Sequence, residues 1–293
     1  MKILITGTTG FFGQEIVKQF NSDIVYCLNR HQGDFQNDLA KSTPSFNQTF
    51  DLVIHNAGLA HFVPKNENNN SLFFDVNVEG TKNLLKGLEN AGVPKKFIFI
   101  SSVSVYGLTI GKNINENYSL SANDPYGLSK IKAEEIIGEW CKKNNVLLTI
   151  LRLPLLVGKN PPGNLGSMIK GIQKGYYFNI DGGKAKKSMV LTEDVAHFIP
   201  VIANYGGVFN LTDGYHPSFF EISSAISKKN VLNIPLFLAK FFAFFGNLIG
   251  DKAPINSRKL KKIVNDLTFD DTEARKYGWN PKLVLNYLES NEI

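Results

Sequence analysis

Cysteine is scarce in this sequence. Among its 293 residues only Cys27 and Cys141 are cysteines, and neither stands at the Cys/Cys or Cys/His spacing of a zinc or redox site. A chain of this length buries a core without disulfide bonds. We therefore expect a protein of a reducing, cytoplasmic setting, with no metal site.

Long apolar runs are missing too. The N-terminal run reaches Gly7 too soon for a signal peptide, and it predicts a strand in a chain that starts at Met1. Residues 236–249 are rich in phenylalanine, but this stretch is shorter than the ~20 residues that cross a bilayer, and Lys240 interrupts it. It predicts a helix packed on a second lobe. The alternative is an interfacial helix that contacts a membrane surface.

Basic residues are not gathered into a long stripe. The chain has 32 Lys and Arg against 26 Asp and Glu, a net charge of +6, and its lysines are scattered. Proteins that bind nucleic acids concentrate their positive charge on one face. We therefore expect no nucleic-acid partner, whereas a small ligand that carries phosphate groups suits the modest excess of positive charge.

Apolar, β-branched segments alternate with helical segments over the first two hundred residues. This order predicts an α/β fold: a Rossmann-like, doubly wound parallel sheet with a small, mostly helical C-terminal lobe for the substrate. Helices are predicted over residues 12–20, 73–90 and 126–144, and strands over 2–6, 24–28, 52–55, 97–101, 147–151 and 208–211. We expect the dinucleotide-binding domain to comprise residues 1–158 and 187–213, and the substrate lobe residues 159–186 and 214–293.

Three glycines follow the first predicted strand and open the first helix. Gly7, Gly10 and Gly13 are spaced G-x-x-G-x-x-G. Glycine lets the backbone turn sharply and approach a pyrophosphate, which then lies at the positive end of the helix. A purely structural turn is the alternative. We predict a dinucleotide cradle that also includes Thr9, Phe11 and Phe12.

The end of the second predicted strand bears on the choice of dinucleotide. NAD sites tend to place an acidic residue there, but this chain has Asn29 and Arg30. A guanidinium suits a 2′-phosphate, so Arg30 favours NADP over NAD, unless it is simply a solvated side chain. Asp38 and Leu39 are expected to border the adenine.

A phenol and an ammonium group stand four residues apart on one predicted helix. Tyr126 and Lys130 therefore lie on the same face, where the cation is expected to lower the pKa of the phenol toward that of a usable base. Upstream, Ser101 and Ser102 end a predicted strand. Ligands bind outside the carboxyl ends of parallel strands, so Ser102 is placed to hold a substrate oxygen.

With these motifs in order, the chain resembles the extended short-chain dehydrogenase/reductase family along essentially its whole length. The three glycines match the family's glycine motif, and Ser102, Tyr126 and Lys130 match its catalytic serine, tyrosine and lysine. The resemblance also implies cofactor contacts from further positions. These are Asn56, Ala57, Gly58, Asn77, Ser101, Leu153 and Pro154, together with Tyr126 and Lys130.

The resemblance narrows to the nucleotide-sugar 4-epimerases and 4-ketoreductases of surface-polysaccharide biosynthesis. Lys187 stands where these enzymes usually have arginine, and residues 267–281 are similar to their closing segment. The 4,6-dehydratases carry Asp-Glu where this chain has Val103 and Ser104, which disfavours dehydration. The substrate contacts implied are Ser102, Val103, Ser104, Tyr126, Asn164, Leu165 and Lys187.

The expected chemistry is hydride transfer at sugar C4, with Tyr126 exchanging a proton with the sugar oxygen, Ser102 holding that oxygen and Lys130 tuning Tyr126. Arg30 favours a ketoreductase that uses NADPH over an epimerase that retains NAD. The alternatives are a noncatalytic dinucleotide sensor and an epimerase for a lipid-linked sugar diphosphate that rests on a membrane through phenylalanines such as Phe241 and Phe244. The resemblance also implies a homodimer formed by the helices that carry Asn77 and Tyr126.

Overall fold

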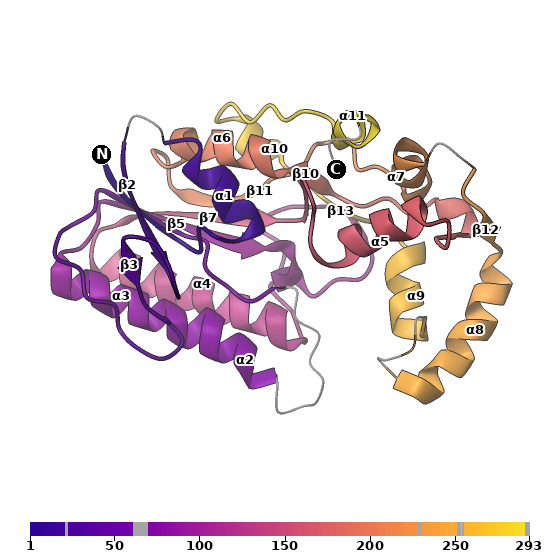
Figure 1. The fold of residues 1–293 in the computed structure, drawn as a ribbon, viewed down its shortest axis with the longest axis horizontal. Coiled ribbons are helices and arrows are strands. Elements are labelled where there is room, and N and C mark those ends of the chain that lie inside the picture. Colours follow the sequence, from indigo (N-terminus) through magenta and orange to yellow (C-terminus); the bar gives the residue numbers. More distant parts are fainter. Residues whose placement is uncertain (21–22, 61–69, 228–229, 251–252, 254, 291–293) are drawn as a thin grey trace.

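A seven-stranded parallel sheet forms the centre of the molecule (Figure 1). The computed structural model describes residues 1–20, 23–60, 70–227, 230–250, 253 and 255–290. The strands lie in the order β11-β7-β5-β4-β1-β2-β3. They are β1 (Lys2–Thr6), β2 (Ile24–Asn29), β3 (Phe35–Gln36), β4 (Leu52–His55), β5 (Lys96–Ser102), β7 (Leu147–Leu153) and β11 (Gly207–Asn210). The strand order reverses between β1 and β4, as in the Rossmann fold, so the predicted fold class is confirmed.

Helices cover both faces of this sheet (Figure 1). One face carries α1 (Phe11–Val17), α6 (Thr192–Ile202) and α10 (Thr272–Arg275). The other carries α4 (Pro125–Lys143) and a continuous helical segment made of α2 (Ser71–Phe74), the π-helical turn η2 (Asp75–Glu79) and α3 (Gly80–Ala91). The three helices predicted from the sequence correspond to α1, this segment and α4.

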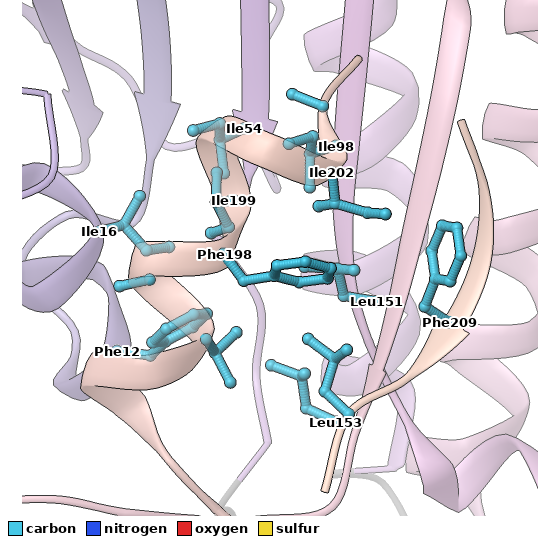
Figure 2. Close-up of a cluster of buried hydrophobic side chains, with 14 of the residues drawn as sticks. Phe12, Ile16, Ile54, Ile98, Leu151, Leu153, Phe198, Ile199, Ile202 and Phe209 are labelled. Carbon is cyan, nitrogen blue, oxygen red and sulfur yellow. The ribbon is translucent and has the colours of Figure 1, made fainter. Parts of the chain in front are cut away.

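Alternation along the strands divides the core into two layers. In β1, Ile3 and Ile5 pack toward α1 and α6, whereas Leu4 packs toward α3 and α4. Figure 2 shows the first layer, in which Phe12 and Ile16 of α1 meet residues of α6 above the strands. Both faces of the sheet are buried, which explains why the strands are almost continuously apolar in sequence.

The second lobe is assembled from short pieces. Outside the main sheet lie the parallel two-stranded pairs β8 (Leu155–Val157) with β10 (Met189–Leu191), β9 (Asn179–Ile180) with β12 (Asn233–Ile234), and β6 (Gly111–Ile114) with β13 (Leu267–Phe269). The helices of the second lobe are α5 (Gly163–Gln173), α7 (Phe219–Ile226), α8 (Leu236–Ile249), α9 (Ser257–Val264) and α11 (Val284–Glu289). Two 3-10 turns complete the elements, η3 (Val103–Tyr106) and η4 (Asp181–Gly183). The domain boundaries stay a prediction.

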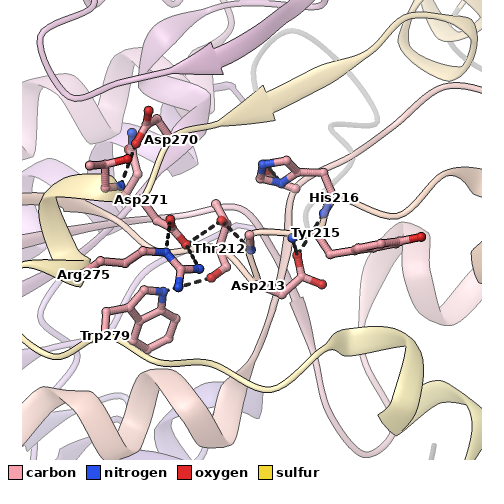
Figure 3. Close-up of polar contacts among 12 residues, drawn as sticks. Thr212, Asp213, Tyr215, His216, Asp270, Asp271, Arg275 and Trp279 are labelled. Carbon is pink, nitrogen blue, oxygen red and sulfur yellow. Dashed lines mark hydrogen bonds and ion pairs between the residues drawn. The ribbon is translucent and has the colours of Figure 1, made fainter.

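The closing segment of the chain is tied to the end of the main sheet by polar contacts (Figure 3). Asp271 accepts hydrogen bonds from Thr212 Oγ1, at 3.0 Å, and from Arg275 Nε, at 2.7 Å. Trp279 Nε1 donates to the carbonyl oxygen of Thr212 at 2.9 Å. These contacts give the motif over residues 267–281 a structural role, because they fasten the last part of the chain beside β11.

Helix α8 has the bounds that the sequence predicts, but it does not bury its phenylalanines. Its buried residues are Ala239, Ala243 and Gly246, which face α9, while Phe241 and Phe244 are 58% and 67% exposed. A Cβ at Gly246 would lie 1.9 Å from the carbonyl oxygen of Ile255, so only a glycine allows this close approach. The packing of α8 therefore depends on small residues.

Within the part of the chain that the structure describes, no helix is long and apolar enough to cross a membrane.

Candidate active site

A cavity of about 1700 Å³ lies at the carboxyl ends of the parallel strands. The residues that follow β1, β4 and β7 line it, and so do the last residues of β5. Helix α2 and the turn η2 contribute to one side of the wall, and α9 contributes from the second lobe. The cavity thus extends from the switch point of the sheet to the substrate lobe, where a doubly wound fold binds its ligand.

The glycine motif forms the floor of this cavity next to the start of α1. Gly7 has φ +69°, and a Cβ there would lie 2.8 Å from Cα of Ala57. A Cβ at Gly13 would lie 2.1 Å from the carbonyl oxygen of Gly7. Asn56 Nδ2 donates to the same oxygen at 3.1 Å. A larger residue at Gly7 or Gly13 would therefore disrupt the turn and its packing against the loop that follows β4.

Two buried amide oxygens lack a partner within the described residues at the β2 end of the cavity. Asn29 Nδ2 donates to Thr8 Oγ1 at 2.7 Å, but Asn29 Oδ1 accepts nothing, and neither does Asn37 Oδ1. Both residues line the cavity, beside the exposed Arg30. Orphaned acceptors are costly unless a ligand donates to them, so these oxygens fit hydroxyl or amino groups such as those of an adenosine.

His55 connects the end of β4 to β1 and to the first turn of α3 through buried hydrogen bonds. Its Nδ1 lies 2.8 Å from Thr6 Oγ1 and its Nε2 lies 3.0 Å from Thr81 Oγ1. Thr81 donates to the carbonyl oxygen of Asn77 at 2.7 Å, and Thr6 Oγ1 accepts from Ala57 N. Therefore His55 donates from Nε2 and accepts at Nδ1. Burial lowers its pKa to about 3, so the ring is neutral.

Asn77 lies in the π-helical turn and joins three parts of the site. Its Oδ1 accepts from Leu59 N at 2.7 Å, while its Nδ2 donates to the carbonyl oxygen of Leu59 and to Ser129 Oγ. Ser129 lies in α4, between Tyr126 and Lys130. Asn77 therefore holds the loop after β4 against the helix that carries these two residues, and a π-turn is a common device for turning a side chain into a functional site.

Ser102 and Tyr126 lie together at the end of β5. Ser102 Oγ caps η3 by accepting from Ser104 N at 3.2 Å. Asp124 caps α4 by accepting from Gly127 N, which places Tyr126 in the first turn. Burial raises the pKa of Tyr126, and the charge of Asp124 adds to this, whereas a hydrogen bond with Ser102 lowers it. The net direction is opposite to the lowering that the sequence led us to expect from Lys130.

The ammonium group of Lys130 is directed at the backbone of β5. It donates to the carbonyl oxygen of Ile100 at 2.7 Å and lies 4.1 Å from the centre of the Phe99 ring. Burial lowers the pKa of Lys130 itself to about 7, partly offset by the charge of Glu134.

A buried ion pair lies one helical turn beyond Lys130. Glu134 Oε2 accepts from Arg152 Nη2 at 2.8 Å, and Ser101 Oγ donates to Glu134 Oε1. Arg152 Nη1 also donates to the hydroxyl of Tyr106 at 3.1 Å. The pair thereby fixes α4 to β7 across the end of β5, underneath the residues that face the cavity.

The structure brings most of the predicted site residues to the cavity wall. The residues on the wall are Gly7, Thr9, Gly10, Phe11, Phe12, Asn29, Arg30, Asp38, Leu39, Asn56, Ala57, Gly58, Asn77, Ser101, Ser102, Val103, Ser104, Tyr126, Lys130, Leu153, Pro154 and Asn164. Gly13, Leu165 and Lys187 are not among them. Leu165 packs into the core of the second lobe, and Lys187 Nζ donates to the carbonyl oxygen of Asn265 at 2.7 Å.

Some residues of the wall were not predicted. Arg258, Lys259 and Lys262 of α9 and Ile249 of α8 line the cavity from the second lobe. The signal in the sequence is the short basic run from Arg258 to Lys262, which is too short to stand out among the scattered lysines. The ion pair between Glu134 and Arg152 was also missed, because its partners are distant in sequence.

The fold and the site define a class of protein: a doubly wound dinucleotide-binding fold that carries a serine, tyrosine and lysine set. Residues 3–211 match the family model described as the NAD dependent epimerase/dehydratase family. The chain belongs to this family.

Curated relatives and solved structures agree with that assignment. The chain is 29% identical to an N-acetyl-α-D-glucosaminyl-diphospho-ditrans,octacis-undecaprenol 4-epimerase of Escherichia coli O157:H7, over 94% of this chain and 89% of the relative. It is 29% identical to a UDP-glucose 4-epimerase of Vibrio cholerae, over 97% and 92%. Its fold is similar to a Thermus thermophilus UDP-glucose 4-epimerase solved with NAD (TM-score 0.74, 19% identity, 100% and 98% covered) and to RMD of Pseudomonas aeruginosa solved with NADPH (TM-score 0.74, 18% identity, 99% and 98% covered).

Proposed function

We propose that this protein is a cytoplasmic, nicotinamide dinucleotide-dependent 4-epimerase of a sugar that is joined to a diphosphate. The observation that carries the proposal is the meeting of Ser102, Tyr126 and Lys130 on the wall of a cavity whose floor is the glycine motif. The two curated relatives named above are 4-epimerases, one of a nucleoside-linked and one of a polyprenol-linked sugar diphosphate. Two free cysteines, Cys27 and Cys141, are consistent with a reducing compartment.

The wall of the cavity favours epimerisation over dehydration. Directly after Ser102 come Val103 and Ser104, which are poor proton donors. Among the described residues of the wall, the acidic side chains are Asp38 and Asp124. Asp38 accepts from Ala40 N beside β2, and Asp124 is engaged as the cap of α4. Elimination of water needs an acid and a base at the sugar ring, and this wall supplies neither beside Ser102.

The residues on the β2 side of the cavity fit the adenosine diphosphate part of a dinucleotide. The glycine turn would hold the pyrophosphate, and the orphaned amide oxygens of Asn29 and Asn37 would accept hydrogen bonds from the adenosine. Arg30 favours NADP, since an exposed guanidinium on this wall can pair with a 2′-phosphate. A bound nicotinamide would supply the acceptor and donor of the C4 hydride.

The chain's own residues handle the proton and the orientation of the sugar. As a phenolate, Tyr126 removes the proton of the C4 hydroxyl during oxidation and returns it during reduction; burial opposes that form, so the reaction needs the positive charge of Lys130 to offset it. Ser102 donates a hydrogen bond to the same oxygen, which holds C4 in place in both steps. Lys130 supplies positive charge beneath the site, and its pKa near 7 makes that charge sensitive to what occupies the cavity.

The test starts with purification without added cofactor, followed by denaturation and identification of any released dinucleotide by mass. Sugar diphosphates deuterated at C4 are then supplied: UDP-glucose, UDP-N-acetylglucosamine and N-acetylglucosaminyl-diphospho-undecaprenol. An epimerase forms the C4 epimer with the deuterium retained and with no net consumption of dinucleotide. Tyr126→Phe should lower kcat by at least about 100-fold, because the proton transfer is lost.

Other results would contradict the proposal. Turnover that consumes one equivalent of NADPH for each sugar would identify a ketoreductase. A Tyr126→Phe variant with most of its turnover would contradict the mechanism. Stoichiometric dinucleotide binding with no turnover of any of these sugars would favour the noncatalytic sensor. Leu128→Ala, an exposed position on the same helix, serves as the matched control and should keep its activity.

A further inference from the structure

Helix α8 places its residues in the reverse of the usual arrangement for a helix in water. Its small residues Ala239, Ala243 and Gly246 are buried, while its large apolar residues are turned outward. Leu248 is 82% exposed and Phe237 is 69% exposed. A surface helix normally directs its apolar stripe into the core, and a contiguous exposed apolar surface marks an interaction site.

The exposed rings lie against one another along the outside of the helix. The ring centres of Phe241 and Phe245 are 5.0 Å apart, and those of Phe244 and Phe245 are 5.6 Å apart. Phe242 is 5.9 Å from Phe241. The phenylalanines therefore form one continuous apolar surface. In Figure 1, α8 and α9 project together from the second lobe, so this surface lies at the edge of the molecule.

The neighbouring helix α9 adds charge of a single sign. Together α8 and α9 carry five basic residues, Lys240, Arg258, Lys259, Lys261 and Lys262, and no acidic residue. Arg258, Lys261 and Lys262 are exposed. An apolar surface beside exposed basic side chains matches a bilayer, whose acyl region accepts the rings and whose anionic head groups pair with the cations.

A second copy of the chain fits this surface less well. A symmetric dimer would bring the same helices together, and so would place the basic residues of one copy beside those of the other. Like charges that are brought close together repel one another. The charge on α9 therefore favours an anionic partner over a second copy.

The helices α8 and α9 also reach the cavity. Ile249, at the end of α8, and Arg258 and Lys262 of α9 lie on the cavity wall. An anion that enters beside α9 thus meets cationic side chains before it reaches Tyr126. A sugar diphosphate whose carrier lies in a bilayer would present its charged groups at this position.

We propose that α8 and α9 form a docking surface for an anionic lipid bilayer, through which the enzyme takes its sugar diphosphate from a lipid carrier in the membrane. The identity of the carrier rests on the proposed epimerase function, whereas the docking itself does not. Because α8 cannot cross the bilayer, the rings insert only into the interfacial region.

The first experiment is co-sedimentation with vesicles of phosphatidylglycerol and phosphatidylcholine, and with phosphatidylcholine alone. We expect the wild-type protein to pellet with the anionic vesicles, and the double variant Phe241→Asp, Phe244→Asp to bind at least about tenfold more weakly. Lys261→Gln should weaken binding about fivefold and only on anionic vesicles. Phe220→Asp, which changes an exposed phenylalanine of α7, should bind like the wild type.

Three results would overturn docking. These are a wild type that stays in the supernatant, a double variant that binds as well as Phe220→Asp, and a dimer in gel filtration that is lost only in the double variant.

A second measurement tests the lipid carrier. On N-acetylglucosaminyl-diphospho-undecaprenol in vesicles, we expect the activity of the double variant to be at least about tenfold lower than that of the wild type. On UDP-N-acetylglucosamine, we expect the two proteins to be equally active. Equal activity there also shows that the double variant is folded. Equal activity of both proteins on the lipid-linked sugar would overturn the membrane route. Co-sedimentation needs no turnover, so a failure of the epimerase assignment would not be mistaken for a failure of docking.

Discussion

Lys130 is a cationic residue whose burial is unfavourable for folding and necessary for the site. Its pKa of about 7 in the folded protein lies below the ordinary 10.5, because burial disfavours the ammonium form. The unfolded chain therefore binds the proton more tightly than the folded one between these two pH values. Stability is reduced at neutral pH and rises as the pH increases toward 10.5.

Replacing this residue separates stability from function. At pH 7, we expect Lys130→Met to raise the free energy of unfolding of the cofactor-free protein by about 2 kcal/mol, since the cost of burying the charge exceeds the loss of the hydrogen bond to Ile100. The gain should shrink as the pH rises toward 10, and epimerase activity should be lost. Denaturant titrations at several pH values measure the free energy of unfolding of both proteins. The control is Lys132→Met, which changes an exposed position on the same helix. A Lys130→Met variant that is less stable than the wild type at every pH would contradict the argument.

Among the elements, α4 and β7 depend on one buried ion pair. Glu134 and Arg152 are each 6% exposed at the side chain, so either one left alone is a buried charge with no opposite charge paired to it. We expect Glu134→Leu and Arg152→Met to destabilise the protein by about 3–5 kcal/mol each, and the double variant to recover much of that loss. A double-mutant cycle by chemical denaturation measures the coupling.

The exposed pair Lys132 and Glu135 on the same helix is the control for that cycle, and no measurable coupling is expected there. If the losses at Glu134 and Arg152 simply add, the pair does not couple α4 to β7, and the contacts of Arg152 with Tyr106 would carry its effect instead.

The elements that could be predicted from sequence are those whose pattern is local. The strands β1 and β4 and the helix α8 have the predicted bounds, because apolar runs of their length stand between clear breaks. The glycine motif and the set of Ser102, Tyr126 and Lys130 were predicted because each occupies a fixed place relative to a strand or helix. The structure places Gly7, Gly10, Ser102, Tyr126 and Lys130 on the cavity wall, and the roles of these residues stay a prediction.

What could not be predicted depends on contacts between distant segments. Strands such as β9 and β12 have only two residues each, too few to show a period. The position of Leu165 depends on which face of α5 meets the second-lobe core. The outward turn of the phenylalanines in α8 follows from small residues that pack on α9, a helix that the sequence did not indicate. Each of these needs the partner segment to be known.

For the molecule as a whole, the buried His55 couples stability to pH. Its pKa of about 3 in the folded protein lies below the ordinary 6.5, so the unfolded chain takes up a proton between these values that the native protein does not bind. Stability contributed by the neutral ring is therefore present above pH 6.5 and is lost as the pH falls toward 3, by about 1.4 kcal/mol for each pH unit. The same ring joins β4 to β1 and α3, and Thr81 of α3 bonds in turn to Asn77, so protonation of the ring breaks contacts of both the fold and the site.

Between pH 7 and pH 5 this one group should lower the free energy of unfolding of the wild type by about 2 kcal/mol. His55→Gln removes the titrating ring; it should be less stable at pH 7 but lose about 2 kcal/mol less than the wild type over this interval. For His197→Gln, at an exposed position on α6, the free energy of unfolding should fall between pH 7 and pH 5 as steeply as it does for the wild type. Equal slopes for the wild type and His55→Gln would show that another group carries the acid sensitivity. In that case the hydrogen bonds from Thr6 to Asn77 would not depend on a neutral histidine.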